Sequence, residues 1–159
     1  MKRILTFKQK VNENLTSNGS VADAIEVAET SGVPTIICSE PGTGKGHAIK
    51  QYAESNGYKF VQIDGATISM DDIQLPKRKF YLDKDYLDYK MSSWWPKEGE
   101  KTILYVAEID RATEAIQKFF MQMVFENKIP KGTTLLFGCS NIEELNSTFV
   151  NKLNVISLT

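Results

Sequence analysis

Five short apolar stretches, separated by segments of helical periodicity or by polar turns, organise this chain. The stretch at 102–107 is almost unbroken, which is typical of a strand buried on both faces of a sheet. The stretches at 34–38 and 133–139 predict two further strands, residues 58–63 alternate at period two, and residues 154–158 predict a short last strand. Because helical segments separate these strands, the pattern indicates an α/β fold with a mostly parallel sheet covered on both faces.

Three segments carry the sequence signals of helices. Ser20 and Asp23 are spaced like a capping box, so a helix is expected to begin here and to end at Gly32. A second helix is expected to follow the glycine-rich segment 39–46 and to run to about Ser55. The third presents one apolar stripe whose members recur every three to four residues: Ile116, Phe119, Phe120, Met123 and Val124.

Two regions lack a clear periodicity. The polar residues 1–19 predict an N-terminal arm that precedes a core domain at 20–159. The aromatic and charged run at 77–90 predicts either a hairpin or an inserted loop, and a solvated hairpin is favoured over a pore loop. Trp94 and Trp95 follow this run and are expected to anchor the loop on the domain.

Composition narrows the class of protein. With 159 residues, of which 42% are hydrophobic and 25% charged, the chain has the size and content of one soluble globular domain. Nineteen basic and twenty acidic residues nearly cancel, so the overall charge indicates no nucleic-acid partner. No apolar run reaches the ~18–20 residues of a membrane span and residues 1–8 lack the apolar core of a signal peptide, so a cytoplasmic protein is expected. Cys38 and Cys139 lie in apolar runs and are expected to be buried, reduced thiols.

The segment Ser-Glu-Pro-Gly-Thr-Gly-Lys-Gly at 39–46 lies between a predicted strand and a predicted helix. Glycines permit positive φ angles and close backbone approach, so such a loop can wrap a polyphosphate with its N–H groups. The following helix points the positive end of its dipole at the same anion, and Lys45 supplies an ammonium group for the β- and γ-phosphates. We therefore predict a nucleotide-binding site made of Glu40, Pro41, Gly42, Thr43, Gly44, Lys45, Gly46 and His47.

Two polar residues follow other predicted strands. Glu108 comes directly after 102–107, and Asn141 comes shortly after 133–139. Ligands of α/β sheets bind at the carboxyl ends of the strands. A carboxylate opposite the glycine-rich loop can polarise a water for attack on a γ-phosphate, and an amide can bind that water or the phosphate. The loop, Glu108 and Asn141 are therefore predicted to form one catalytic site.

The order and spacing of these motifs resemble those of the AAA+ ATPases, and within them the MoxR-type branch. The segment Trp-Trp-Pro-Lys-Glu-Gly-Glu-Lys-Thr-Ile-Leu-Tyr-Val-Ala-Glu-Ile-Asp-Arg-Ala at 94–112 carries the likeness, which covers about residues 20–158. The resemblance implies a three-layer P-loop NTPase fold with strand order 5-1-4-3-2, bound ATP or ADP, Glu108 as catalytic carboxylate and Asn141 as sensor. It also implies a ring, usually hexameric, formed by copies of this chain or with a partner AAA+ protein, that acts on a protein client.

Several positions depart from this family's pattern. Gly46 replaces the Ser or Thr whose hydroxyl binds Mg²⁺, and Ala107 replaces the metal-binding Asp directly before Glu108. No residue is therefore assigned as a metal ligand, and Mg²⁺ is expected to be held weakly, through the phosphates. Lys152 stands where the family has its arginine finger, and Arg111 is a candidate for contact with a neighbouring subunit's nucleotide. We expect nucleotide binding that depends little on Mg²⁺, and slow hydrolysis, because phosphoryl transfer depends on positioning and charge neutralisation.

The leading hypothesis is an AAA+ core that binds ATP or ADP, hydrolyses slowly or not at all, and assembles or remodels a partner protein. A non-hydrolysing module that regulates another complex is an alternative from a different class. A small nucleoside monophosphate kinase is a third reading, because such kinases tolerate Gly-Lys-Gly in their loop. His47 in place of a Thr or Ser, and only three arginines in the chain, disfavour the kinase; His47 is instead expected to cap the helix or contact phosphate weakly.

Overall fold

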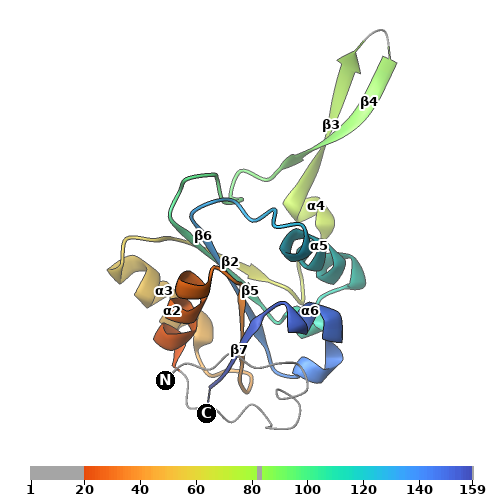
Figure 1. The fold of residues 1–159 in the computed structure, drawn as a ribbon. Helices are drawn as coiled ribbons and strands as arrows, with labels where there is room; N and C mark the ends of the chain where they lie inside the picture. The colour runs from red at the N-terminus through yellow and green to blue at the C-terminus, as the bar shows by residue number, and fades with distance from the viewer. Residues whose placement is uncertain (1–19, 82–83, 159) are drawn as a thin grey trace.

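Five parallel strands form the central sheet of the computed structural model, which describes residues 20–81 and 84–158 (Figure 1). The arm predicted at 1–19 lies outside these residues. In chain order the strands are β1 (Thr35–Cys38), β2 (Lys59–Asp64), β5 (Thr102–Ala107), β6 (Thr133–Cys139) and β7 (Asn154–Ser157). They lie in the order β2-β5-β6-β1-β7, and every neighbouring pair is parallel. Numbered along the chain and read from β7, this order is 5-1-4-3-2, so the predicted α/β sheet is confirmed.

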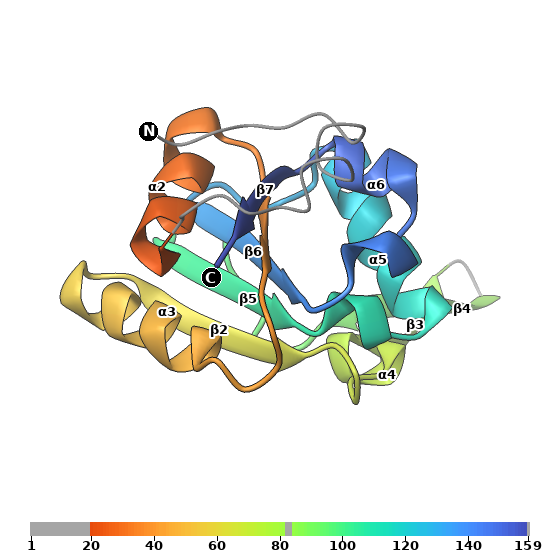
Figure 2. The same cartoon turned by 90° about the horizontal axis from the view of Figure 1, so that it is seen from below.

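Helices cover both faces of this sheet and give a three-layer arrangement (Figure 2). One face carries α2 (Val21–Ser31) and α3 (Lys45–Ser55), and the other carries α4 (Met70–Ile73), α5 (Glu114–Phe125) and α6 (Ser147–Asn151), with the 3-10 turns η1 (Ile109–Arg111) and η2 (Ile142–Glu144). The predicted capping box of Ser20 and Asp23 begins α2, and Gly32 ends it in a left-handed conformation. The short helices α4 and α6 carry too few residues for a periodic pattern and were not predicted.

The region between β2 and β5 contains an antiparallel hairpin of β3 (Gln74–Tyr81) and β4 (Lys84–Met91). Figure 1 shows the two strands projecting away from the body of the domain. The hairpin alternative for this region is therefore correct. At its base, the Ser92 backbone N–H donates to the Ile73 carbonyl oxygen at 2.8 Å, which joins the returning strand to α4.

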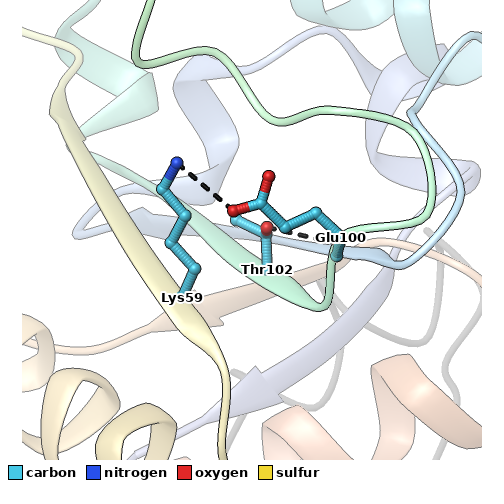
Figure 3. A network of polar contacts seen from close by, with 3 residues as sticks. All are labelled: Lys59, Glu100 and Thr102. Carbon is cyan, nitrogen blue, oxygen red and sulfur yellow. Dashed lines mark hydrogen bonds and ion pairs between the residues drawn. The ribbon is translucent and has the colours of Figure 1, made fainter.

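Trp94 and Trp95 lie after the hairpin and fix the chain on the domain. Trp95 is only 7% exposed, and its ring meets Phe119 edge-on at a centroid distance of 5.7 Å. The predicted anchoring role is confirmed. At the amino ends of the neighbouring strands β2 and β5, Lys59 and Glu100 form an exposed ion pair at 3.4 Å (Figure 3). Such a surface pair contributes at most about 1 kcal/mol, so the strand ladder, rather than this pair, holds the register.

Cys38 and Cys139 are buried free thiols, as predicted. They are direct partners in the β1–β6 register, and their Sγ atoms lie 3.2 Å apart. None of the helices in the described part of the chain is long and apolar enough to cross a membrane.

Candidate nucleotide-binding site

The glycine-rich segment forms a tight loop between β1 and α3. Gly42 and Gly44 both have φ angles of 78°, a conformation that glycine adopts without steric cost. Gly44 is the N-cap of α3 and provides no side-chain acceptor for the first N–H groups of the helix. These groups therefore point out of the helix end towards the loop, where an anion can accept from them.

Contacts to β6 hold this loop in place. The Ser39 backbone N–H donates to the Cys139 carbonyl oxygen at 3.1 Å, and the Lys45 ammonium donates to the same oxygen at 3.4 Å. The Ser39 and Thr43 hydroxyl groups are 3.1 Å apart and close the loop from inside. The Lys45 side chain thus extends across the loop to the end of β6, next to the place where the loop would bind a phosphate.

A cavity of about 310 Å³ opens between this loop and the carboxyl ends of β2, β5 and β6. Its lining comprises Pro41, Gly42, Thr43, Gly44, Lys45, Gly46, Gln62, Asp64, Tyr105, Ala107, Glu108 and Ser140. Six of the eight predicted nucleotide-binding residues therefore line one cavity, and predicted catalytic Glu108 lines it with them. Glu40 and His47 are exposed residues that flank the loop and do not line the cavity.

Glu108 has an unusual backbone at the end of β5. Its φ of 54° and ψ of 45° lie in the left-handed region, which a residue other than glycine, asparagine or aspartate enters at a cost of about 1–2 kcal/mol. A glycine at position 65 permits this turn, because a Cβ there would lie 2.6 Å from the Ala107 carbonyl oxygen. Backbone strain of this kind collects at functional sites, where it aims a side chain.

Asp110 joins the turn after β5 to the turn after β6, a connection that the sequence did not reveal. Its Oδ2 accepts from the backbone N–H groups of Ser140 at 3.3 Å and Asn141 at 3.1 Å. Asp110 is 9% exposed, and its other oxygen, Oδ1, is buried with no hydrogen-bond partner among the described residues. The carboxylate therefore fixes the spacing between Glu108 and the loop that carries Ser140.

Asn141 itself lies beside the cavity, with its amide turned to η2. Its Oδ1 accepts from the Glu143 backbone N–H at 3.2 Å, and its Nδ2 donates to Glu144 at 3.3 Å. Ser140 is the residue of this loop that lines the cavity. The sensor role of Asn141 stays a prediction, and Ser140 is a cavity residue that sequence reasoning missed.

The two predicted intersubunit residues lie on separate elements. Arg111 is exposed at the end of η1, and Lys152 is exposed directly after α6. Neither lines the cavity of its own chain. Both are therefore open to contact from another protein, and their predicted role between subunits stays a prediction.

Tyr105 and Cys139 are uncharged groups next to the cavity. Burial raises the pKa of Tyr105 to about 12, with smaller contributions from Cys139 and Glu108. The hydrogen bond to Cys38, followed by burial, raises the pKa of the Cys139 thiol far above its ordinary value. Both groups therefore stay uncharged at neutral pH, and the other ionisable side chains that line the cavity belong to Lys45, Asp64 and Glu108.

This loop, its helix and the five parallel strands define a three-layer P-loop NTPase fold. Among solved structures, the chain is similar to Thermotoga maritima RuvB, described as a Holliday junction branch migration motor: 16% identity, TM-score 0.54, covering 95% of this chain and 45% of that one. It is also similar to a proposed ATPase of Cytophaga hutchinsonii: 14% identity, TM-score 0.52, covering 96% of this chain and 52% of that one. At these identities the likeness establishes the fold.

The chain spans about half the length of the solved structures that it matches. A scan against protein families finds no match for this chain, and a search of curated proteins finds none either. The activity of the chain must therefore be argued from its own site.

Proposed function

We propose that this chain is an AAA+ core of MoxR type that binds ATP or ADP and hydrolyses ATP slowly. One observation carries the proposal: the glycine loop, Lys45 and Glu108 line the same cavity at the carboxyl edge of the sheet. The loop N–H groups and the α3 dipole would bind the phosphates, and Lys45 would neutralise their charge. The output would be assembly or remodelling of a partner protein by a ring of subunits, in the cytoplasm.

The chemistry assigned to Glu108 is general-base catalysis. Its carboxylate would orient and polarise a water for attack on the γ-phosphate, with Ser140 or Asn141 holding that water or the phosphate. Mg²⁺, when bound, would neutralise charge on the β- and γ-phosphates. Gly46 and Ala107 lack the oxygens that would hold this ion in its usual place, which supports slow turnover.

Calorimetric titration with ATP and ADP in metal-free buffer tests nucleotide binding directly. Lys45→Ala should weaken binding at least tenfold because the phosphates lose their ammonium partner. Lys50→Ala is the matched control, since Lys50 is an exposed lysine of the same helix outside the cavity. An unaltered chain that binds neither nucleotide, in metal-free buffer or with Mg²⁺, would refute the proposal.

Hydrolysis and assembly need separate experiments. Glu108→Gln should abolish the slow release of phosphate and leave ADP affinity within about threefold, because the amide keeps the size of the side chain but accepts no proton. Mass measurement in solution, with and without ATP, tests the ring. Arg111→Ala and Lys152→Ala should weaken a nucleotide-dependent assembly, whereas Lys118→Ala, on the exposed side of α5, should not.

A non-hydrolysing interaction module is the second candidate, and Gly46 and Ala107 favour it. This module would bind nucleotide and assemble with a partner complex but release no phosphate above a Glu108→Gln background. A nucleoside monophosphate kinase would instead transfer phosphate to AMP, CMP or UMP. Phosphate release without acceptors, compared with transfer in their presence, separates the three functions.

A further inference from the structure

The position of Gly46 is filled by a side chain from the neighbouring strand. A Cβ at residue 46 would lie 2.8 Å from Oε1 and 3.1 Å from Nε2 of Gln62. The Gln62 amide therefore occupies the space in which a Ser or Thr side chain at position 46 would begin. A polar oxygen is thus present where the usual hydroxyl is absent, and it comes from β2 instead of α3.

A carboxylate on β2 likewise lies next to the position on β5 that lacks one. Asp64 is the register partner of Ala107 in the parallel β2–β5 pair, just as Gln62 is the partner of Tyr105. Residues two apart on a strand share a face, so Asp64 and Gln62 lie on the same face as Ala107 and Tyr105. All four line the cavity. Position 107 on β5 has no carboxylate, but its register partner on β2, Asp64, has one.

Local contacts hold Asp64 in place. Its Oδ1 accepts from the Ala66 backbone N–H at 3.0 Å, which closes a turn at the end of β2. Gly65 lies within this turn and packs on β5, where its N–H donates to the Ala107 carbonyl oxygen at 2.7 Å. These two bonds tie the Asp64 carboxylate to the end of β5 and hence to the cavity.

The donor set suits Mg²⁺ bound to a nucleotide. Magnesium prefers oxygen ligands, keeps several waters, and is commonly held by one or two carboxylates together with phosphates. Within residues 20–81 and 84–158, no group of three or more His, Cys, Asp and Glu side chains forms a metal cluster. A site completed by phosphate oxygens needs no such group, and one carboxylate with one amide oxygen is sufficient.

We infer that Asp64 and Gln62, on β2, hold the Mg²⁺ of a bound nucleotide, directly or through its waters, in place of a hydroxyl at 46 and a carboxylate at 107. The inference rests on the proposed nucleotide binding. It changes the expectation from sequence, because Mg²⁺ should now strengthen binding. A metal ion displaced towards β2 would also combine the proposed slow hydrolysis with retained metal affinity.

The test measures the affinity for ADP by calorimetry, first in EDTA and then with Mg²⁺, and takes the ratio of the two. The unaltered chain should bind ADP at least tenfold more tightly with Mg²⁺. Asp64→Asn should remove most of this gain and leave metal-free affinity unchanged or slightly higher, because a negative charge near the phosphates is lost. Asp71→Asn, an exposed residue of α4 outside the cavity, is the control and should keep the full gain.

Two double variants distinguish a loss of metal binding from a general change in structure. Asp64→Asn combined with Ala107→Asp should restore the gain from Mg²⁺, because the carboxylate returns to β5. Gly46→Ser should displace the end of the exposed Gln62 side chain and supply a hydroxyl in its place, so Gly46→Ser with Gln62→Ala should bind ADP and keep a Mg²⁺ dependence. Electron paramagnetic resonance of Mn²⁺ with ADP provides a readout apart from affinity, and Asp64→Asn should leave more Mn²⁺ free.

The outcomes separate this inference from the proposed function. If ADP binds in EDTA and Asp64→Asn keeps the full gain from Mg²⁺, the inference is wrong and the nucleotide site stands. If Mg²⁺ gives no gain to the unaltered chain, the inference is wrong in the same way. If the unaltered chain binds no nucleotide with or without metal, the proposed function fails and the inference fails with it.

Discussion

The two faces of the sheet are packed with side chains of different size. The aromatic face comprises Trp95, Phe119, Phe120, Phe137 and Phe149, whose rings meet in succession at centroid distances of 5.2 to 5.7 Å. The buried core of the site face, under α2 and α3, comprises mainly smaller aliphatic residues together with Tyr105: Ala24, Ile25, Ala28, Ile49, Ala53 and Ile103. The aromatic side chains of Tyr52, Tyr58 and Phe60 pack against this core in partly exposed positions. The comparison indicates that large rings stabilise the domain on one side, whereas small residues on the other side let α3 and its loop approach the strand ends.

Phe120→Ala should have the largest effect on stability. Phe120 is fully buried and contacts the rings of Trp95, Phe119 and Phe137, so its truncation leaves a cavity in the middle of the aromatic face. We expect the free energy of unfolding to fall by about 3–5 kcal/mol, measured by urea denaturation.

Phe125→Ala is the matched control, because Phe125 lies on the same helix and is 42% exposed. It should change stability by less than ~0.5 kcal/mol. Phe120→Leu, with a smaller loss, keeps the measurement possible if the alanine variant does not fold. Equal effects at 120 and 125 would contradict the role assigned to the aromatic face.

The buried stripe of α5 on the aromatic face and the glycine-rich loop of the site were both predicted from sequence. Ile116, Phe120 and Met123 recur at helical spacing, so the buried side of α5 follows from periodicity alone. The loop at 39–46 was equally clear, because its glycines and lysine are contiguous in the chain.

Residues that depend on strand pairing escaped prediction. Asp64 lies beside Ala107 because β2 pairs with β5, and Gln62 reaches Gly46 because α3 packs on β2. The local sequence shows that positions 46 and 107 lack the hydroxyl and the carboxylate. It does not show that Gln62 and Asp64, on β2, lie next to these positions. Asp110 was missed for the same reason, since its partners are the backbone N–H groups of residues 140 and 141.

Gly138→Ala tests how closely the site face is packed. A Cβ at 138 would overlap the Tyr105 hydroxyl oxygen and lie 3.0 Å from the Cζ atom of the same ring. We expect a loss of about 1–3 kcal/mol in the free energy of unfolding. Tyr105→Phe in the same chain should recover part of this loss because the overlapping oxygen is removed. Purely additive effects in this double-mutant cycle would exclude the proposed collision.

Alkaline pH should destabilise the site face through Tyr105. The folded pKa of Tyr105, about 12, is above the ordinary value of 10.0, so the folded state holds a proton that the unfolded state loses. The stabilising contribution is complete below pH 10 and is lost as pH rises towards about 12. Unfolding measured at pH 9 and 11 should show a decrease about 1 kcal/mol smaller in Tyr105→Phe than in the unaltered chain. Identical decreases would mean that the Tyr105 hydroxyl ionises as freely in the folded state.

Removal of the outer part of the hairpin should have the smallest effect, because this part projects from the domain and the deletion keeps Met91, which packs on the aromatic face. β3 and β4 form a separate two-stranded sheet that projects from the domain (Figure 1). Leu75 and Lys90 are register partners, so replacing residues 76–89 by Asn-Gly leaves a tight turn between them and keeps the bond from Ser92 to Ile73. Urea denaturation should show a change below ~1 kcal/mol, since an isolated hairpin is marginally stable by itself. ADP affinity should also be unchanged, because the hairpin projects away from the body of the domain (Figure 1), whereas the cavity lies between the loop at 39–46 and the carboxyl ends of β2, β5 and β6. A decrease in the free energy of unfolding as large as that of Phe120→Ala would show instead that the hairpin stabilises the core. The comparison of the aromatic face with the site face would then have to include the hairpin as a third region.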